Sequence, residues 1–197
     1  MASIESARTS DLLTQARKLL RAGVWRIACR RAASGAHVAT EQALHSSQMR
    51  RVLVVCHGNI CRSPYAAQLL RKLLNSAVEV RSSGSHASVE RNSPDTVRRI
   101  AKENGIDLSA HRSAVLSKAV VTWADLVVIM DRHNWQAVRA FGRHDGIVWL
   151  GTLDFGREID DPDGKNEEET RDILARLHRC TELLAKRILC QIASTAT

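Results

Sequence analysis

Long hydrophobic runs, metal-binding clusters and internal repeats are all absent from this sequence. No stretch of roughly 18 apolar residues occurs, so a membrane-spanning helix is not expected. The five cysteines are an odd number without zinc-type spacing, which favours free thiols in a reducing cytoplasm over disulfides or a zinc site. Eight scattered histidines lack paired carboxylates, so neither a metal nor another cofactor is predicted.

Basic residues dominate the first quarter of the chain rather than its whole length. The overall charge is +8, but residues 1–51 hold nine Lys or Arg and three Asp or Glu, a net charge of +6. The remaining residues therefore carry only +2. Because the excess charge belongs to the N-terminal part, it does not indicate a nucleic-acid-binding surface on the main domain.

The N-terminal part combines a predicted helix with a predicted linker. Apolar residues recur at helical spacing over residues 12–27, opposite several basic residues, which indicates a basic amphipathic helix. Residues 32–48 are rich in Ser, Ala, Gly and His and are predicted to form a linker.

We therefore expect a helical extension over residues 1–49 and the main domain over residues 50–197. Three interpretations of the extension stay open: a docking helix that can contact a membrane surface, a transit peptide, or upstream sequence that is seldom translated. In the third case Met49 is a natural start for a compact domain.

Strand-like and helix-like segments alternate beyond residue 50. Strands are predicted at residues 51–55, 78–82, 126–130 and 147–150, and helices at residues 64–75, 94–104, 132–140 and 167–188. Ser93 is the predicted N-cap of the second helix. The alternation predicts an α/β domain of three layers, with a mostly parallel four-stranded sheet and helices on both faces. Ligands bind at the carboxyl ends of the strands of such sheets, and the first strand ends at Cys56.

The segment from Val52 to Pro64 places a cysteine between an apolar strand and a helix. Cys56 ends the apolar run, a short loop follows, and Pro64 favours the start of a helix. Gly58 lets the backbone approach an anion, and the positive end of the helix favours negative charge at the same place. Arg62 adds a fork of donors that fits two phosphoryl oxygens. The pattern predicts a phosphate-binding loop.

Cys56 is the predicted nucleophile of this loop. Helix N-termini and neighbouring cations favour the ionised form of a thiol, so we expect a thiolate at neutral pH. Ser63 is placed to donate its hydroxyl to the sulfur, and Asn59 can brace the loop through its side chain. The residues expected to surround the phosphoryl group through the loop backbone are His57, Gly58, Asn59, Ile60 and Cys61.

Val55 to Pro64 match the signature V-C-x-G-N-x-C-R-S-P at every defined position. The chain therefore resembles the low-molecular-weight protein tyrosine phosphatases, from about residue 51 to about residue 193. The resemblance implies a general acid in an Asp-Pro pair more than a hundred residues downstream. Asp161 precedes Pro162 in the chain's single Asp-Pro pair, although an acidic surface loop is the commoner meaning of such a run.

Asp161 would supply the general acid that hydrolysis of phosphotyrosine requires. A carboxylic acid that protonates the leaving phenolate typically contributes about 10²–10⁴-fold to the rate. The acidic neighbours of Asp161 resist simultaneous ionisation, which favours its protonated form. Asp163 is expected to border the substrate and to repel acidic peptides.

Cys61 has a role implied by the resemblance and a simpler structural interpretation. As a second thiol on the loop it could capture an oxidised Cys56 in a disulfide and protect it from irreversible oxidation. The simpler interpretation is a small hydrophobic residue packed under the loop. Both interpretations can hold together.

Several departures from the family pattern bear on the substrate. Aromatic residues are absent after the Asp-Pro pair and near His86 on the opposite wall, so an aryl ring is expected to be held less firmly. Relatives that act on phosphoarginine carry a small polar residue where this chain has Ile60, which favours phosphotyrosine. A phosphoarginine phosphatase, an arsenate reductase of the same fold and a non-catalytic phosphoryl-binding adaptor nevertheless stay open as functions.

The resemblance also suggests a partner. Bacterial enzymes of this kind often reverse tyrosine kinases that control exopolysaccharide export, and by this analogy we expect a tyrosine-phosphorylated protein as substrate in the cytoplasm.

Overall fold

The computed structural model describes residues 35–45 and 49–195. Residues from Ala36 onward form one compact unit. The amphipathic helix predicted over residues 12–27 lies outside the described residues. None of the described helices is long and apolar enough to cross a membrane.

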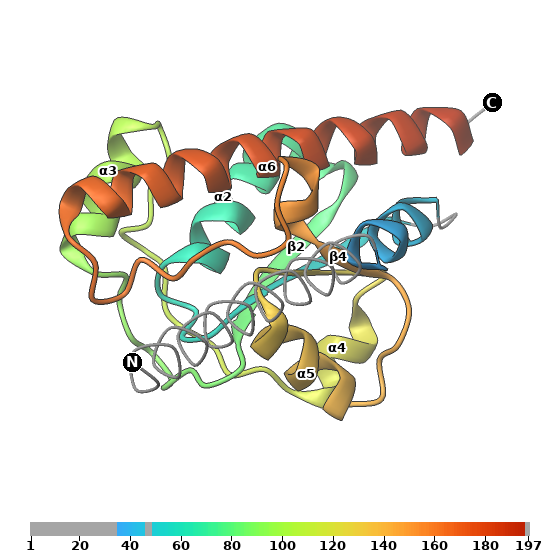
Figure 1. The fold of residues 1–197 in the computed structure, drawn as a ribbon, viewed down its shortest axis with the longest axis horizontal. Helices are drawn as coiled ribbons and strands as arrows, with labels where there is room; N and C mark the ends of the chain where they lie inside the picture. Colours follow the sequence, from blue (N-terminus) through green and yellow to red (C-terminus); the bar gives the residue numbers. More distant parts are fainter. Residues whose placement is uncertain (1–34, 46–48, 196–197) are drawn as a thin grey trace, which may run out of the picture. The chain divides into compact units, whose positions relative to one another are not determined.

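The unit contains a four-stranded sheet in which every neighbouring pair of strands is parallel, in the order β2-β1-β3-β4 (Figure 1). The strands are β1 (Arg51–Cys56), β2 (Glu79–Gly84), β3 (Leu126–Ile129) and β4 (Ile147–Trp149). The helices are α2 (Arg62–Leu74), α3 (Asp95–Glu103), α4 (Lys118–Trp123), α5 (Arg132–Ala140) and α6 (Glu167–Thr195), with short 3-10 turns η1 (Asn75–Ala77) and η2 (Leu150–Leu153). The predicted α/β class is confirmed.

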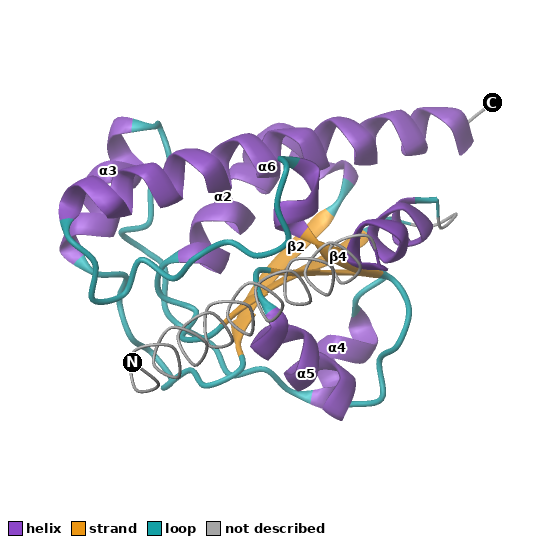
Figure 2. Cartoon of the chain, viewed as in Figure 1, coloured by secondary structure: helices purple, strands orange, loops and turns teal. Residues whose placement is uncertain are grey.

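The sheet separates two hydrophobic cores because successive strand residues face opposite sides. Val52 and Val54 of β1 belong to the core shared with α2, α3 and α6. Leu53 and Val55 belong to the core shared with α4 and α5. Figure 2 shows these helices on the two sides of the strands. Burial on both faces explains why the strands are continuous apolar runs, as is usual in parallel sheets.

Several elements differ from the predicted ones. α2 begins at Arg62, two residues before Pro64, and α6 continues to Thr195. The predicted cap of α3 is wrong: its N-cap is Pro94, and the buried hydroxyl of Ser93 has no partner among the described residues. α4 was not predicted, because its β-branched residues are weak helix formers; Ser117 caps it through a hydrogen bond from Val120 N.

Residues 35–44, placed in the predicted linker, form a helix. Its Ala36, Ala43 and Leu44 are buried in the two cores. The hydroxyl of its fully buried Thr40 accepts a hydrogen bond of 3.0 Å from Trp149 N, at the end of β4. These apolar and polar contacts explain why a stretch of Ala, Thr and His residues is ordered here. The predicted domain boundary at residue 49 stays a prediction.

We expect Thr40→Val to lower the free energy of unfolding by about 1–3 kcal/mol, because the buried N–H of Trp149 would lose its acceptor at nearly unchanged side-chain volume. Chemical denaturation of the full chain measures this effect. The reverse change on the exposed side of the same helix, Val38→Thr, is the control and should shift stability by less than about 0.5 kcal/mol. Equal effects of the two substitutions would contradict the anchoring role of Thr40.

Candidate active site

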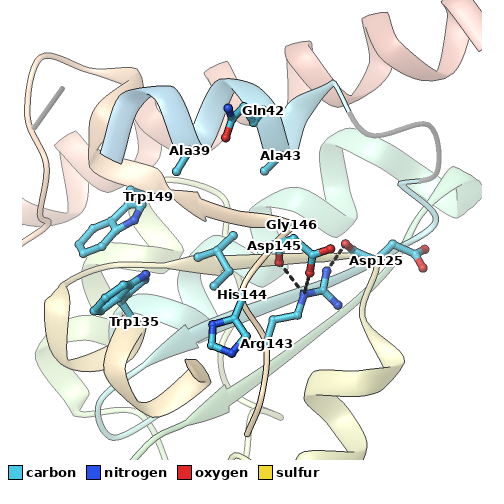
Figure 3. A pocket seen from close by; sticks show the side chains of 11 residues that line it. Ala39, Gln42, Ala43, Asp125, Trp135, Arg143, His144, Asp145, Gly146 and Trp149 are labelled. Carbon is cyan, nitrogen blue, oxygen red and sulfur yellow. Dashed lines mark hydrogen bonds and ion pairs between the residues drawn. The ribbon is translucent and has the colours of Figure 1, made fainter. Parts of the chain in front are cut away.

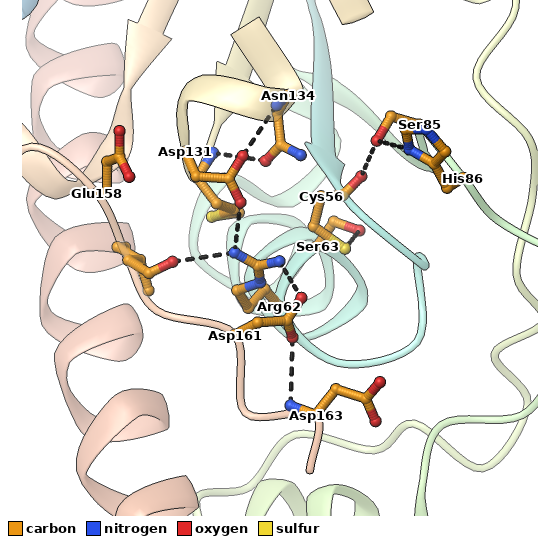
Figure 4. Close-up of polar contacts among 12 residues, drawn as sticks. Cys56, Arg62, Ser63, Ser85, His86, Asp131, Asn134, Glu158, Asp161 and Asp163 are labelled. Atoms are coloured by element: carbon orange, nitrogen blue, oxygen red, sulfur yellow. Dashed lines mark hydrogen bonds and ion pairs between the residues drawn. The ribbon is translucent and has the colours of Figure 1, made fainter. Parts of the chain in front are cut away.

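The predicted site residues meet at the carboxyl end of the sheet (Figure 4). Cys56 is the last residue of β1, and Asp131 follows the neighbouring strand β3 as the N-cap of α5. Asp161 comes from the segment between η2 and α6. β1 lies beside β2 on one side and beside β3 on the other, which is the position where parallel sheets of this kind bind ligands.

Two donors contact the sulfur of Cys56. The backbone N–H of Asn59 donates to Cys56 Sγ at 3.2 Å, and the hydroxyl of Ser63 donates to it at 3.0 Å. Both donors belong to fully buried residues. The bond from Ser63 is the one expected from the sequence. Both hydrogen bonds use the sulfur as acceptor and hold it in place within the loop.

Asn59 fixes the shape of the loop. Its φ of 51° lies in the left-handed region, which asparagine tolerates better than most residues. Its side chain donates to Ser63 Oγ and accepts from Ala114 N, each at 2.8 Å. Its carbonyl accepts a 2.7 Å hydrogen bond from His111 Nε2. Burial lowers the pKa of His111, and the cations of Arg71 and Arg112 lower it further against the opposing effect of the bond to Asn59.

Gly84 at the end of β2 was missed by the sequence analysis. A Cβ atom at this position would lie 2.6 Å from the carbonyl oxygen of His57 and 2.8 Å from Asn59 N, so the loop packs directly against a glycine. A glycine at the carboxyl end of a strand was the available signal. Ser82 of the same strand makes no hydrogen bond to the loop in the described part of the chain.

Arg62 is buried and bonded to two carboxylates. Its Nη1 donates to Asp131 Oδ2 at 2.8 Å and to the carbonyl of Ile159 at 3.0 Å, and its Nη2 donates to Asp161. Its Nε has no partner among the described residues. Burial alone would lower the pKa of Arg62, but negative charge on Cys56, Asp161 and Asp131 raises it. The guanidinium therefore stays charged beside the sulfur.

Asp131 was not among the predicted site residues. It is itself held in place: its Oδ1 accepts from Asn134 N at 2.9 Å, and the buried Asn134 accepts from Met130 N at 3.2 Å. An acidic residue two positions after the end of the buried strand β3 was the signal that could have identified it.

The mouth of the site is a hollow of about 240 Å³. Its lining consists of His57, Arg62, Asp131, His133, Glu158, Ile159, Asp160 and Asp161. The rings of His57 and His86 stack with their centroids 4.6 Å apart, so the wall expected to lack aromatic groups carries two imidazoles. Asp163 donates its N–H to Asp161 Oδ1 at 3.3 Å and has an exposed side chain. Among the described residues, no group of three His, Cys, Asp or Glu could hold a metal.

Cys61 lies beneath the loop as a buried thiol. Burial raises its pKa to about 12, with further contributions from Asp161 and Cys56. Its packing in the core fits the interpretation as a small hydrophobic residue. Cys180 of α6 is also buried, and its pKa is raised to about 11 by burial.

A second hollow, of about 360 Å³, lies between the helix over residues 35–44 and the start of β4 (Figure 3). Arg143 in its wall already donates to the carbonyls of Ala124, Asp125 and Asp145 at 2.6–2.8 Å. The guanidinium in this hollow is thus bonded within the protein.

Comparison with known proteins agrees with this geometry. The family model described as low molecular weight phosphotyrosine protein phosphatase matches residues 51–193. The low molecular weight protein-tyrosine-phosphatase Etp of Escherichia coli K12 is 33% identical over 142 residues, which cover 70% of this chain and 93% of Etp.

Two solved structures extend the comparison. The tyrosine phosphatase Wzb from Escherichia coli K30, in complex with sulphate, has a TM-score of 0.65 and 30% identity over 72% of this chain and 99% of its own. The arginine phosphatase YwlE from Geobacillus stearothermophilus has a TM-score of 0.68 and 32% identity over 74% of this chain and 96% of its own.

The described thiols should differ in reactivity. At pH 8 iodoacetamide should modify Cys56 and leave Cys61 and Cys180 unmodified. Raised pKa values of about 12 and 11 keep these two thiols protonated far above pH 8, whereas the sulfur of Cys56 accepts two hydrogen bonds. Peptide mapping by mass spectrometry measures the modification. Denatured protein, in which all five cysteines should react, is the control. Equal labelling of Cys61 and Cys56 in the native protein would contradict the expectation.

Proposed function

The chain belongs to the low molecular weight phosphotyrosine protein phosphatase family, and we propose that it hydrolyses phosphotyrosine in proteins through a phosphocysteine on Cys56. The observation that supports this most strongly is the pairing of Cys56 with Arg62. The sulfur accepts two hydrogen bonds, and the buried guanidinium beside it keeps its Nε without a partner among the described residues. Such an arrangement is suited to a bound oxyanion next to a nucleophile.

In the first step, the sulfur of Cys56 attacks phosphorus and the bond from phosphorus to the phenolic oxygen breaks. Asp161 gives its proton to the departing phenolate. The hydrogen bonds from Asn59 and Ser63 stabilise the thiolate before the attack and make it a better leaving group afterwards.

In the second step, Asp161 acts as a base. Its carboxylate accepts a proton from water, the water oxygen attacks phosphorus, and the bond from sulfur to phosphorus breaks. Inorganic phosphate leaves and the thiolate of Cys56 is restored, so the enzyme returns to its starting state without a cofactor.

Arg62 is proposed to bind the phosphoryl oxygens throughout both steps. Its guanidinium contacts Asp131 and Asp161. A phosphoryl dianion would replace Asp161 as its partner and leave that carboxyl group free to face the leaving oxygen. Asp131 would keep its own contact and act as a positioning residue for the guanidinium.

His57 and His86 are proposed to form one wall for the substrate ring. Their stacked imidazoles offer a flat surface at the mouth, in place of the larger aromatic side chains absent from this chain. Exposed Asp163 would favour basic over acidic peptides.

A phosphoarginine phosphatase is the second candidate. The likeness to YwlE favours it, as does a protein-arginine-phosphatase of Geobacillus stearothermophilus that is 42% identical over 80 residues, 41% of this chain and 53% of that protein. The buried, aliphatic Ile60 in the loop favours phosphotyrosine instead.

The physiological setting follows by analogy. We propose a tyrosine-phosphorylated protein as partner, with a tyrosine kinase of exopolysaccharide export as the first candidate, and action in the cytoplasm. The four described cysteines are free thiols, which fits a reducing compartment. Reversible protection of Cys56 by Cys61 belongs to the same proposal.

The proposed roles predict different losses for two substitutions. Cys56→Ser should abolish hydrolysis of an aryl phosphate, because no thiolate remains to form the intermediate. Asp161→Asn should lower kcat by about 10²–10⁴-fold without weakening phosphate binding, because it removes a carboxylate that competes with phosphate for Arg62. Steady-state kinetics and product inhibition by phosphate measure these effects.

Asp145→Asn makes the same change as Asp161→Asn at an exposed position away from the mouth and is the control. Full turnover by Cys56→Ser would contradict the role of Cys56 as nucleophile. If a loss of phosphate affinity accounted for the whole defect of Asp161→Asn, the role of Asp161 as general acid would be contradicted.

Paired peptides that carry phosphotyrosine or phosphoarginine separate the two candidate substrates. We expect a higher kcat/KM for phosphotyrosine in the wild type, and Ile60→Thr should shift the ratio toward phosphoarginine because a small polar side chain admits and bonds a guanidinium. Ile60→Val, which keeps the side chain aliphatic, should preserve the preference. A higher kcat/KM of the wild type for phosphoarginine would contradict the phosphotyrosine phosphatase and favour the phosphoarginine phosphatase.

A further inference from the structure

A basic hollow of about 370 Å³ lies beside β2, the edge strand of the sheet. Its lining includes Arg71, Arg81, Ser82, Ser83, His111 and Arg112, which come from α2, from β2 and from the segment before α4. No acidic residue lines it within the described part of the chain. It shares no lining residue with the mouth of the Cys56 site. We call it the basic pocket.

Arg71 is a cation without a carboxylate partner. Its Nε and Nη2 donate to the carbonyl of Val80 at 3.0 and 2.8 Å, and its Nη1 donates to Gln68 Oε1 at 3.0 Å. Among the described residues no acid lies within ion-pair distance of it. Burial lowers the pKa of Arg71, and no neighbouring negative charge opposes this effect.

Arg112 also lacks a carboxylate partner, and part of its guanidinium makes no hydrogen bond among the described residues. Its Nη1 donates to the carbonyls of Ser109 and His111 at 3.1 and 2.8 Å. Its Nε and Nη2 have no hydrogen-bond partner in the described part of the chain, and it makes no ion pair there. Arg81 does have a partner, Glu79 at 2.7 Å, while its guanidinium covers the ring of Trp123 at 4.1 Å.

Three arginines thus line one hollow, and only one of them, Arg81, has a carboxylate partner, Glu79. Like charges held close together repel one another, and a bound anion would relieve this repulsion. Arginine forks match phosphate and carboxylate groups in geometry, and the two serines of β2 add small polar side chains. The volume exceeds what a single phosphate ion needs.

We propose that the basic pocket binds a small multivalent oxyanion that carries phosphoryl or carboxylate groups. Arg112 supplies the free N–H donors, and Arg71 and Arg81 supply the surrounding positive charge. This site is separate from the loop at Cys56 and does not depend on the proposed hydrolysis. It is connected to that loop through His111, which lines the pocket and donates to the carbonyl of Asn59.

Titration of the full chain with pyrophosphate or citrate, followed by amide chemical shifts at constant ionic strength, tests this proposal. Because pyrophosphate can also enter the loop at Cys56, the amides of residues 81–83, 112 and 115 report the basic pocket and those of residues 57–61 report the loop; His111 and Ala114 are left out because both bond to Asn59. We expect both groups to shift, with separate dissociation constants. Tighter binding of pyrophosphate would identify a phosphoryl ligand, and tighter binding of citrate a polycarboxylate.

Arg112→Gln should weaken binding at the pocket by roughly tenfold or more, because a charge-assisted bond is lost, and should leave the shifts of the loop unchanged. Arg81→Gln provides a second test if the first variant unfolds. Arg98→Gln, at an exposed arginine of α3 already paired with Asp95, is the matched control. Shifts confined to residues 57–61, or equal weakening by Arg98→Gln, would overturn the proposal.

Discussion

The contact between a buried guanidinium and its acidic partners organises the functional end of this molecule. Arg62 opens α2 directly after the loop, and it can stay buried and charged because Asp131, Asp161 and the carbonyl of Ile159 accept its hydrogen bonds. Removing one partner of a buried ion pair is costly, so these distant segments are tied to one another. Negative charge on the sulfur of Cys56 is one of the factors that raise the pKa of Arg62, so the loop and this cation are electrostatically linked.

Much of the fold was predictable because burial on both faces of a parallel sheet leaves a strong sequence pattern. The apolar runs of β1 and β3 and the bounds of α5 were located within one or two residues. The helix over residues 35–44 and the short α4 were not, because their order depends on contacts with distant residues such as Trp149 rather than on local propensity. Ser93 failed as a cap because Pro94 takes that position.

The residues of the candidate site also differ in how well the sequence predicted them. A contiguous motif revealed Cys56, Arg62 and the bond from Ser63, since a few neighbouring residues specify both the loop and its chemistry. Asp161 was found through an Asp-Pro pair. Asp131 and Gly84 were missed because each acts through a partner far away in sequence, and an isolated acid or glycine carries little information by itself. The stacked histidines are a comparable case, visible only once β2 is placed beside the loop.

The pairing of Arg62 with Asp161 has a consequence for which anions can bind. Two carboxylates already contact the one guanidinium, so its positive charge is more than balanced. An incoming dianion would add negative charge at this place, and its binding is unfavourable unless one carboxylate moves away from Arg62. The side chain of Asp161 is 37% exposed and that of Asp131 16%, so Asp161 has more room to move. The protein would therefore discriminate between anions by their ability to compete with one of its own carboxylates.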